Sequence, residues 1–435
     1  MIDLEKYQAV VDSVDPITLS GRVCQVIGLV IESVGPAVSI GENCRIESGR
    51  DHGAIACEVV GFRNDKVLLM PLGDVTGIAP GSRVIASHEP FVVNVGHELL
   101  GRVLNGLGAP IDGKGPIAAS GLRSVAHAAP DPLTRKRITR PMATGIRAID
   151  AMLTCGKGQR IGIFSGSGVG KSVLLGMVAR DSEADVNVIG LIGERGREVR
   201  DFLDKDLKEE GLKKSVVVAV TSDQASLIRV KGAMTATAIA EYFRDLGLDV
   251  MLMMDSVTRV AMAQREIGLA IGEPPTSKGY TPSVFAMLPR LLERSGTSAL
   301  GSITGLYTVL VEGDDMTEPV ADAVRSILDG HIVLSRKMAH LNHYPAIDVL
   351  ESVSRLMIDV VPEEHTRMAN QIKEILAVYR EAEDLINIGA YVKGSNPKID
   401  LAIEKIGGIS GFLKQSINEF SGYDETIERL VKLAA

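Results

Sequence analysis

A glycine-rich loop limits the folds open to this chain more than any other segment does. The loop reads FSGSGVGKS at residues 164–172, directly after the apolar run RIGIF and before VLLGMVAR. Glycines at Gly166, Gly168 and Gly170 let backbone N–H groups close around phosphate oxygens, and a helix that begins right after them adds its positive N-terminal dipole. A buried strand, this loop and a helix therefore predict a phosphate-binding α/β domain.

One position departs from the usual pattern G-x-x-x-x-G-K-[ST], because Ser165 stands where the first glycine is expected. That position only makes the tight turn, and a small residue is a plausible replacement there. Lys171 would then reach the β- and γ-phosphates of a nucleotide, and the Ser172 hydroxyl would ligate Mg²⁺. The residues expected to hold the phosphates are Gly166, Ser167, Gly168, Val169, Gly170, Lys171, Ser172 and Val173.

Two carboxylates are expected beside this loop, because each follows an apolar strand. Asp255 ends VMLMM, as expected for the acid that holds Mg²⁺ through water. Glu194 follows VIGLIG in the stretch GERGREV, where a carboxylate can polarise water for attack on the γ-phosphate. Two plainer interpretations stay open: a strand cap for Asp255, and for Glu194 a salt bridge to a neighbouring arginine.

The patterns along the chain predict three domains after a short N-terminal segment, residues 1–18. Short β-rich runs such as RVCQVIGLVIES and DKVLLMPL, separated by turn signals, predict a β-barrel over 19–92. Apolar strands alternate with helices over 93–360, which predicts a parallel α/β domain around the phosphate loop. Apolar residues at helical spacing predict a helical domain over 361–435. The basic run TRKRITR at 134–140 is expected to be a solvated linker rather than a binding patch.

Composition narrows the functional classes. The formal net charge of −8 argues against sequence-independent binding of nucleic acid. No apolar stretch reaches the roughly 20 residues of a membrane-spanning helix, and the acidic N-terminus is unlike a signal peptide, so a cytoplasmic protein is expected. The four cysteines are irregularly spaced and predict reduced thiols. No metal ligand is assigned to His340 or His343.

Several segments together resemble the nucleotide-binding subunits of rotary ATPases and their relatives in protein export. They are TGIRAIDAMLTCGKGQRIGIFSGSGVGKS, GERGREV, VEGDDMTEPVADAVRSILDGHIVLSR and HYPAIDVLESVSR. Residues 345–354, PAIDVLESVS, match the ten-residue signature of that superfamily. Within it, LTCGKGQRIGIF and INIGAYVKGSNPKID most resemble the flagellar protein-export ATPase, and the similarity covers nearly the whole chain.

The resemblance implies that residues 93–360 form a parallel-sheet P-loop (RecA-like) ATPase domain, and it implies a role for each matching residue. Lys171 and Ser172 bind the triphosphate and Mg²⁺, Asp255 is the acid of the Mg²⁺ site, and Glu194 is the catalytic carboxylate. Arg195 is implied as a support on the phosphate side.

Two further implied roles lie in and after the stretch HYPAIDVLESVSR. Tyr344 matches the aromatic residue that stacks beside adenine. Arg355 matches the arginine that enters the site of the neighbouring subunit and stabilises charge in the transition state.

The expected protein is therefore a homohexameric ATPase that uses ATP and Mg²⁺ to drive type III export of flagellar proteins. The expected partners are a stator-like regulatory subunit, a central coiled-coil stalk protein, the export gate and cargo–chaperone complexes, with peripheral contact to the membrane. Three alternatives stay open: the ATPase of a virulence-type secretion system, a non-catalytic subunit of a rotary synthase, and a hexameric RNA translocase. An RNA translocase would need a basic, aromatic-bearing N-terminal domain, which this chain does not predict.

Overall fold

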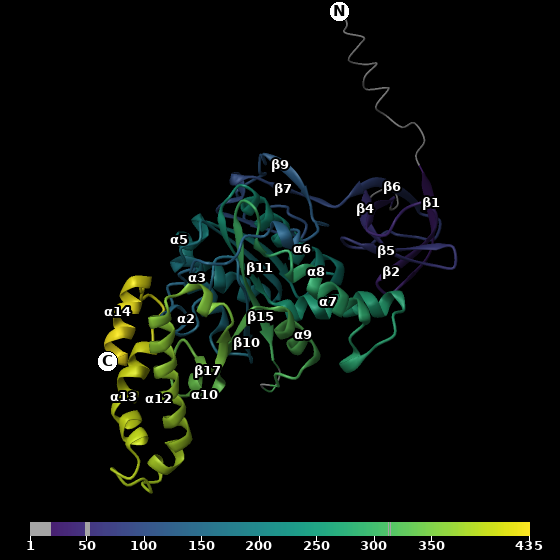
Figure 1. Cartoon of the computed structure of the whole chain (residues 1–435). Helices are drawn as coiled ribbons and strands as arrows, with labels where there is room; N and C mark the ends of the chain where they lie inside the picture. The colour runs from purple at the N-terminus through teal and green to yellow at the C-terminus, as the bar shows by residue number, and fades with distance from the viewer. Residues whose placement is uncertain (1–18, 48–52, 312, 314) are drawn as a thin grey trace, which may run out of the picture.

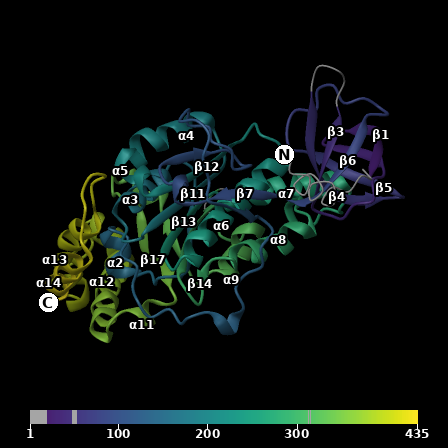
Figure 2. The ribbon, with the colours of Figure 1, turned by 90° about the horizontal axis from the view of Figure 1, so that it is seen from above.

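The computed structural model describes residues 19–47, 53–311, 313 and 315–435, so the predicted segment 1–18 lies outside the described residues. Three parts follow one another along the chain: a β-barrel, a large sheet with helices on both faces, and a group of C-terminal helices (Figure 1). Seen from above, the barrel and the C-terminal helices lie at opposite ends of the sheet domain (Figure 2). The predicted fold class is confirmed. The domain boundaries stay a prediction.

The barrel has six strands that close in the order β1-β2-β5-β4-β3-β6. Side chains alternate between inside and outside along the strands, and the interior is aliphatic, with Ile31, Ile46 and Leu69 fully buried. This interior matches a chain that has no tryptophan and 4% aromatic residues. The strands are β1 Ser20–Ile27, β2 Val30–Val34, β3 Glu42–Glu47, β4 Ala54–Arg63, β5 Lys66–Pro71 and β6 Arg83–Pro90.

The central sheet has the strand order β17-β16-β10-β15-β13-β11-β12-β8, with the short β14 paired to β15. Its inner strands are buried at nearly every position because helices cover both faces. A separate two-stranded ribbon pairs β7 Val92–Val95 with β9 Gly121–Ser124. The strands of the sheet are β8 Arg102–Leu104, β10 Arg160–Ser165, β11 Val186–Glu194, β12 Ser215–Thr221, β13 Asp249–Asp255, β14 Gly296–Thr297, β15 Ser302–Leu310, β16 Gly330–Leu334 and β17 Ile347–Ser354.

The helices fall into two sets, one around the sheet and one after it. Those of the sheet domain are α2 Arg147–Met152, α3 Lys171–Asp181, α4 Gly196–Asp201, α5 Lys208–Lys213, α6 Ser226–Asp245, α7 Val257–Ile271, α8 Pro282–Leu292, α9 Pro319–Ile327, α10 Arg336–His340 and α11 Met357–Val360. Those of the C-terminal part are α12 Glu363–Asn387, α13 Pro397–Leu413 and α14 Tyr423–Ala434. Among the described residues, no helix combines the length and the apolar character that crossing a membrane requires.

The direction of the last strand differs from the parallel pattern. Strands β8 and β10 to β13, with β15 and β16, run parallel, so they all end at one edge, which we call the carboxyl edge. Strand β17 runs antiparallel to β16. It therefore starts at the carboxyl edge and ends at the opposite edge, which we call the amino edge. The apolar pattern of β17 does not predict this reversal. The outermost strand of a sheet has similar residues whether it runs parallel or antiparallel to its neighbour.

The basic run at 134–140 is only partly a solvated linker. Lys136, Arg137 and Arg140 are exposed, as expected. Arg135, however, is half-buried and donates to the backbone carbonyls of Ser295 at 2.8 Å and Glu293 at 2.5 Å. These carbonyls follow helix α8 and lack partners within it, so a guanidinium that reaches them is stabilised there. The expectation was wrong for Arg135.

Candidate active site

The phosphate loop connects the end of β10 to the start of α3, as predicted. Gly168 has φ 79° and Gly170 has φ 93°, the left-handed region that glycine adopts without strain. Gly166 and Val169 are buried, whereas Ser167 and Gly168 are exposed at the tip of the loop. Val173 is half-buried in the first turn of α3. Ser165 is buried at the end of β10, and its hydroxyl has no recorded hydrogen-bond partner among the described residues.

Lys171 lies between the two predicted carboxylates. Its Nζ contacts Asp255 Oδ1 in a short ion pair and lies 3.5 Å from Glu194 Oε1. Burial alone would lower the pKa of Lys171, but the charges of Asp255 and Glu194 outweigh it, and the net effect raises this pKa. The lysine is therefore a fixed cation at the carboxyl edge of the sheet. The structure brings these three side chains together although they come from three different segments.

The surroundings of Glu194 suit a group that accepts a proton near neutral pH. Burial raises the pKa of Glu194 to about 7, against the opposing effect of Lys171. The charge of Asp255 and a hydrogen bond with Glu198 contribute to this rise of the Glu194 pKa. The same hydrogen bond lowers the pKa of Glu198. A general base works best when its pKa lies near the working pH.

Asp255 is almost fully buried at the end of β13. Its Oδ1 accepts a hydrogen bond of 2.7 Å from the Thr308 hydroxyl, so the carboxylate is held from the neighbouring strand β15. The Ser172 hydroxyl lies in the first turn of α3, one residue after Lys171. Carboxylate and hydroxyl oxygens are donors that Mg²⁺ accepts when it arrives with a nucleotide, so these two residues fit the ion.

Tyr344 lies against the phosphate loop. A Cβ atom added to Gly170 would be 3.5 Å from the Tyr344 ring, and the ring is two-fifths exposed. The Tyr344 carbonyl accepts a hydrogen bond of 2.9 Å from the Gln415 N–H, which brings the C-terminal segment 414–420 beside it. That segment exposes Ile417 and Phe420. The partly exposed Tyr344 offers an aromatic ring that suits the flat surface of a nucleobase, and the segment joined to its backbone adds exposed apolar side chains.

Arg355 lies at the amino edge, away from the phosphate loop of its own chain. It directly follows β17, and its N–H donates to the Asp329 carbonyl at 3.0 Å. The loop begins at the other end of β10, and the five steps of about 3.3 Å between the six residues of that strand separate the two edges by roughly 16 Å. The exposed side chain therefore does not reach this chain's own phosphate loop. Tyr344 and Arg355, which flank the same strand, lie at opposite edges.

Two arginines border the carboxylates. Arg195 precedes α4, and its side chain is 80% exposed, 3.5 Å from Glu198. Arg259 was not among the residues predicted from the sequence. Its aliphatic part packs against Gly193, where an added Cβ atom would lie 2.8 Å from Arg259 Cβ. The Nε of Arg259 is buried without a recorded partner among the described residues. Its place four residues after Asp255, on the first turn of α7, is the signal that could have found it.

Three family models match the chain and together cover most of it. The nucleotide-binding domain of the ATP synthase alpha/beta family matches residues 145–354, and the beta-barrel domain of that family matches residues 23–88. The C-terminal domain of the T3SS EscN ATPase matches residues 361–432.

Whole proteins are similar as well. The flagellum-specific ATP synthase of Bacillus subtilis is 55% identical, over 98% of this chain and 99% of its own length. The type 3 secretion system ATPase of Xanthomonas euvesicatoria is 51% identical, over 95% and 93%. The assembled ATPase EscN of the enteropathogenic E. coli type III secretion system superposes with a TM-score of 0.91 at 47% identity, over 95% of this chain and 100% of that one. The chain therefore belongs to the ATP synthase alpha/beta family, among the ATPases of flagellar and type 3 secretion systems.

Proposed function

We propose that this protein hydrolyses ATP to drive type III export of flagellar proteins, as a homohexamer with its active sites between subunits. The observation that carries the proposal is the division of the catalytic groups between two edges of the sheet. The carboxyl edge holds Lys171, Glu194 and Asp255, and the amino edge holds Arg355. A closed ring that sets the amino edge of each subunit against the carboxyl edge of the next would complete every site.

Within one subunit, the residues bind and orient the nucleotide. Lys171 and the backbone of the loop grip the β- and γ-phosphates, and Arg259 and Arg195 offer further positive charge on the phosphate side. Tyr344 and Phe420 receive the base. Mg²⁺ held by Ser172, and through water by Asp255, would neutralise charge on the phosphates.

Glu194 would act on the attacking water. Its carboxylate accepts a proton as the water's oxygen approaches the γ-phosphorus in line with the bond to the leaving oxygen. With the nucleotide bound, Lys171 turns from the acids toward the phosphates, which leaves Glu194 free to orient the water. Burial keeps the site dry, so each of these charges acts more strongly than it would in bulk water.

An arginine from the neighbouring subunit would supply the positive charge that stabilises the transition state at the γ-phosphate. Such a group is worth about 10³ to 10⁵ in rate, or roughly 4 to 7 kcal/mol of barrier. A lone subunit should therefore bind ATP and hydrolyse it slowly. Closing and reopening of each boundary with the nucleotide state would change the shape of the ring in sequence.

The flagellar assignment is supported by similar proteins that carry a flagellar name. The Bacillus subtilis protein named above and that of Treponema pallidum, also a flagellum-specific ATP synthase and 52% identical, both match over at least 96% of their length. The virulence-type alternative shares the catalytic residues, and the cargo chaperone that copurifies with the protein would separate the two.

The partners and the location are part of the same proposal. EscN has been solved in complex with its central stalk EscO, and this chain matches that structure with a TM-score of 0.88. A coiled-coil stalk, a stator-like regulatory subunit, the export gate and cargo–chaperone complexes would meet the ring at the cytoplasmic face of the membrane.

The experiment that tests the proposal compares binding and turnover in three variants. Arg355→Ala and Glu194→Gln should bind nucleotide like the wild type in an equilibrium titration and should release phosphate slowly. Lys171→Ala should lose affinity itself. The ATPase rate per subunit should rise with protein concentration, in step with the mass in solution. A wild-type turnover in Arg355→Ala, or a rate that does not depend on assembly, would refute the shared site.

A further inference from the structure

A buried glutamine at the amino edge holds the strand end that carries Arg355. Gln159 directly precedes β10 and is fully buried. Its Nε2 donates to the Asp329 carbonyl and to the Ser354 hydroxyl, both at 3.1 Å. Its Oε1 accepts the Gly156 N–H at 2.7 Å. The amide therefore joins three segments that are distant in the sequence.

Both acceptors of the Gln159 Nε2 group are linked to Arg355. The Asp329 carbonyl that accepts from Gln159 also accepts the Arg355 N–H at 3.0 Å. Ser354 is the residue before Arg355, and its hydroxyl donates in turn to the Thr154 carbonyl at 2.8 Å. One side chain, Gln159, thus contacts both the residue before Arg355 and the carbonyl to which the Arg355 N–H donates.

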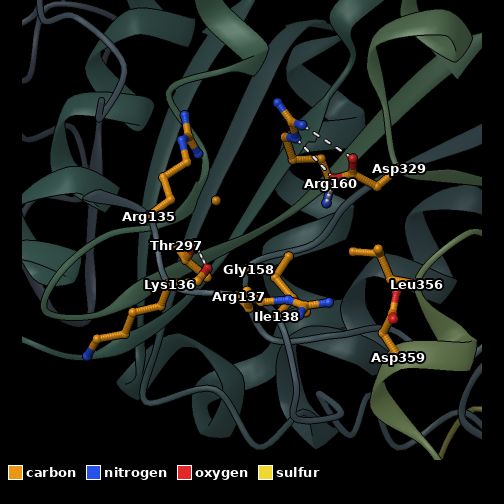
Figure 3. A pocket seen from close by; sticks show the side chains of 11 residues that line it. Arg135, Lys136, Arg137, Ile138, Gly158, Arg160, Thr297, Asp329, Leu356 and Asp359 are labelled. Carbon is orange, nitrogen blue, oxygen red and sulfur yellow. Dashed lines mark hydrogen bonds and ion pairs between the residues drawn. The ribbon is translucent and has the colours of Figure 1, made fainter. Parts of the chain in front are cut away.

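Asp329 is itself fixed. Its carboxylate accepts hydrogen bonds from the Arg160 backbone N–H and from the Arg160 guanidinium, at 3.1 to 3.3 Å. Figure 3 shows this pair joined by dashed lines in a cavity of about 330 Å³, which Leu356, the residue after Arg355, also lines. In contrast, no hydrogen bond or ion pair is recorded for the Arg355 guanidinium within the described part of the chain, so only its backbone is anchored.

We propose that Gln159 is a positioning residue for the arginine donated to the neighbouring subunit. The inference rests on the proposed function, because it requires Arg355 to act in trans. A long side chain amplifies small movements of its backbone, and a displacement of about 1 Å at a reacting centre can cost about a hundredfold in rate. Replacing Gln159 by leucine would remove one of the two donors to the Asp329 carbonyl and the donor to the Ser354 hydroxyl, and would loosen the end of β17.

Mixed rings test the proposal with two kinds of subunit. The recipient carries Arg355→Ala and keeps its own phosphate site. The donor carries Lys171→Ala and keeps Arg355. Neither hydrolyses ATP well alone, but mixing them restores sites in which a donor arginine faces a recipient pocket. The readout is the rate of phosphate release in a single turnover, which requires one completed site and not a ring in which all six sites work.

Gln159→Leu is then added to one partner at a time. In the donor it should lower the restored rate by about tenfold to a hundredfold. In the recipient it should leave the restored rate unchanged, because the recipient supplies no arginine. Equal losses on both sides, or no loss on the donor side, would overturn the inference. If the parent pair without Gln159→Leu shows no restored activity, the arginine does not act in trans and the proposed function fails with it.

Ser354 offers a milder variant in case Gln159→Leu does not fold. Ser354→Ala in the donor removes one of the two hydrogen bonds that Gln159 Nε2 donates and should give a smaller loss, again on the donor side only. Ser354→Thr retains the hydroxyl and should restore the rate. A loss that Ser354→Thr does not recover would contradict the role of this contact.

Discussion

In the proposed mechanism Glu194 accepts the proton, and the burial that raises its pKa to about 7 predicts how activity depends on pH. The base must be deprotonated to accept a proton from water, and kcat/KM reports the groups of the free enzyme. We therefore expect kcat/KM to fall as the pH drops below about 7. In Glu194→Gln the small residual rate should not show this limb. A pH profile of ATP turnover at subsaturating ATP measures both.

Glu198 provides a matched variant for the same pKa. Its charge and its hydrogen bond raise the pKa of Glu194, so Glu198→Gln should lower that pKa. The acid limb of the profile should move to lower pH, while the rate at pH 8 stays within a few-fold of the wild type. A limb that moves upward, or does not move, would show that another group governs it.

The segment 414–420 lies beside Tyr344, the proposed base site, and one buried arginine holds it to α2. Arg147 is 2% exposed, and its Nε donates to the Phe412 carbonyl at 2.9 Å. Its guanidinium also makes short contacts with the Lys414 carbonyl and with Glu419. The Arg147 N–H donates to Gln415 Oε1 at 2.9 Å. The C-terminal helices are thereby tied to the nucleotide domain directly beside Tyr344.

Arg147→Met should separate these elements. Three acceptors lose a charged donor, which costs about 3 kcal/mol, and the segment that bears Phe420 becomes mobile. We expect a lower melting temperature together with a weaker affinity for ATP. Glu419→Gln is the control: Glu419 is 39% exposed, so this change should have a small effect on both. Unchanged ATP affinity in Arg147→Met would show that segment 414–420 does not line the base site.

The sequence predicts which residues stand at the strand ends of the carboxyl edge. It predicts less well the contacts there between residues that are far apart in the chain. The strand before the loop, Glu194 and Asp255 follow from local patterns, because parallel strands all end on one side. The reversal of β17 does not, and neither does the contact of Tyr344 with Gln415. Each depends on pairing between residues far apart in the chain. Gln159 and Arg259 look like ordinary members of their segments until the fold shows their neighbours.

The barrel is joined to the sheet domain by a buried ion pair between Lys231 on α6 and Glu58 on β4. Lys231 also lies 5.4 Å from the centre of the Phe91 ring, and Arg63 donates to the Ile271 carbonyl at 2.9 Å. Burial raises the pKa of Glu58, and Lys231 opposes this. The ionised carboxylate is therefore tolerated at this boundary only because the lysine faces it.

Lys231→Met should loosen the barrel in a pH-dependent way. A carboxyl whose folded pKa exceeds its unfolded value makes the fold less stable as the pH rises through that window. Breaking a buried pair costs about 3 to 5 kcal/mol, so the variant should be cleaved faster between barrel and sheet domain at pH 8 than at pH 5. The double variant Lys231→Met with Glu58→Gln buries no charge and should lose the pH dependence. Limited proteolysis at the two pH values measures this.

The division of each site between two subunits predicts how mutant subunits act in a ring. An Arg355→Ala subunit disables only the site of the neighbour that would receive its arginine. If the six sites worked independently, rings assembled from equal amounts of mutant and wild-type chains would retain roughly half of the activity. If each boundary must close in turn, a single failed site stalls the ring. Only rings of six wild-type chains would then work, and roughly 2% of the activity would remain. We expect the steep loss, since closing one boundary in a ring moves the next. A titration of the mutant fraction, read as phosphate release at constant total protein, decides between them, and a linear decline would contradict sequential closure while leaving the shared site intact.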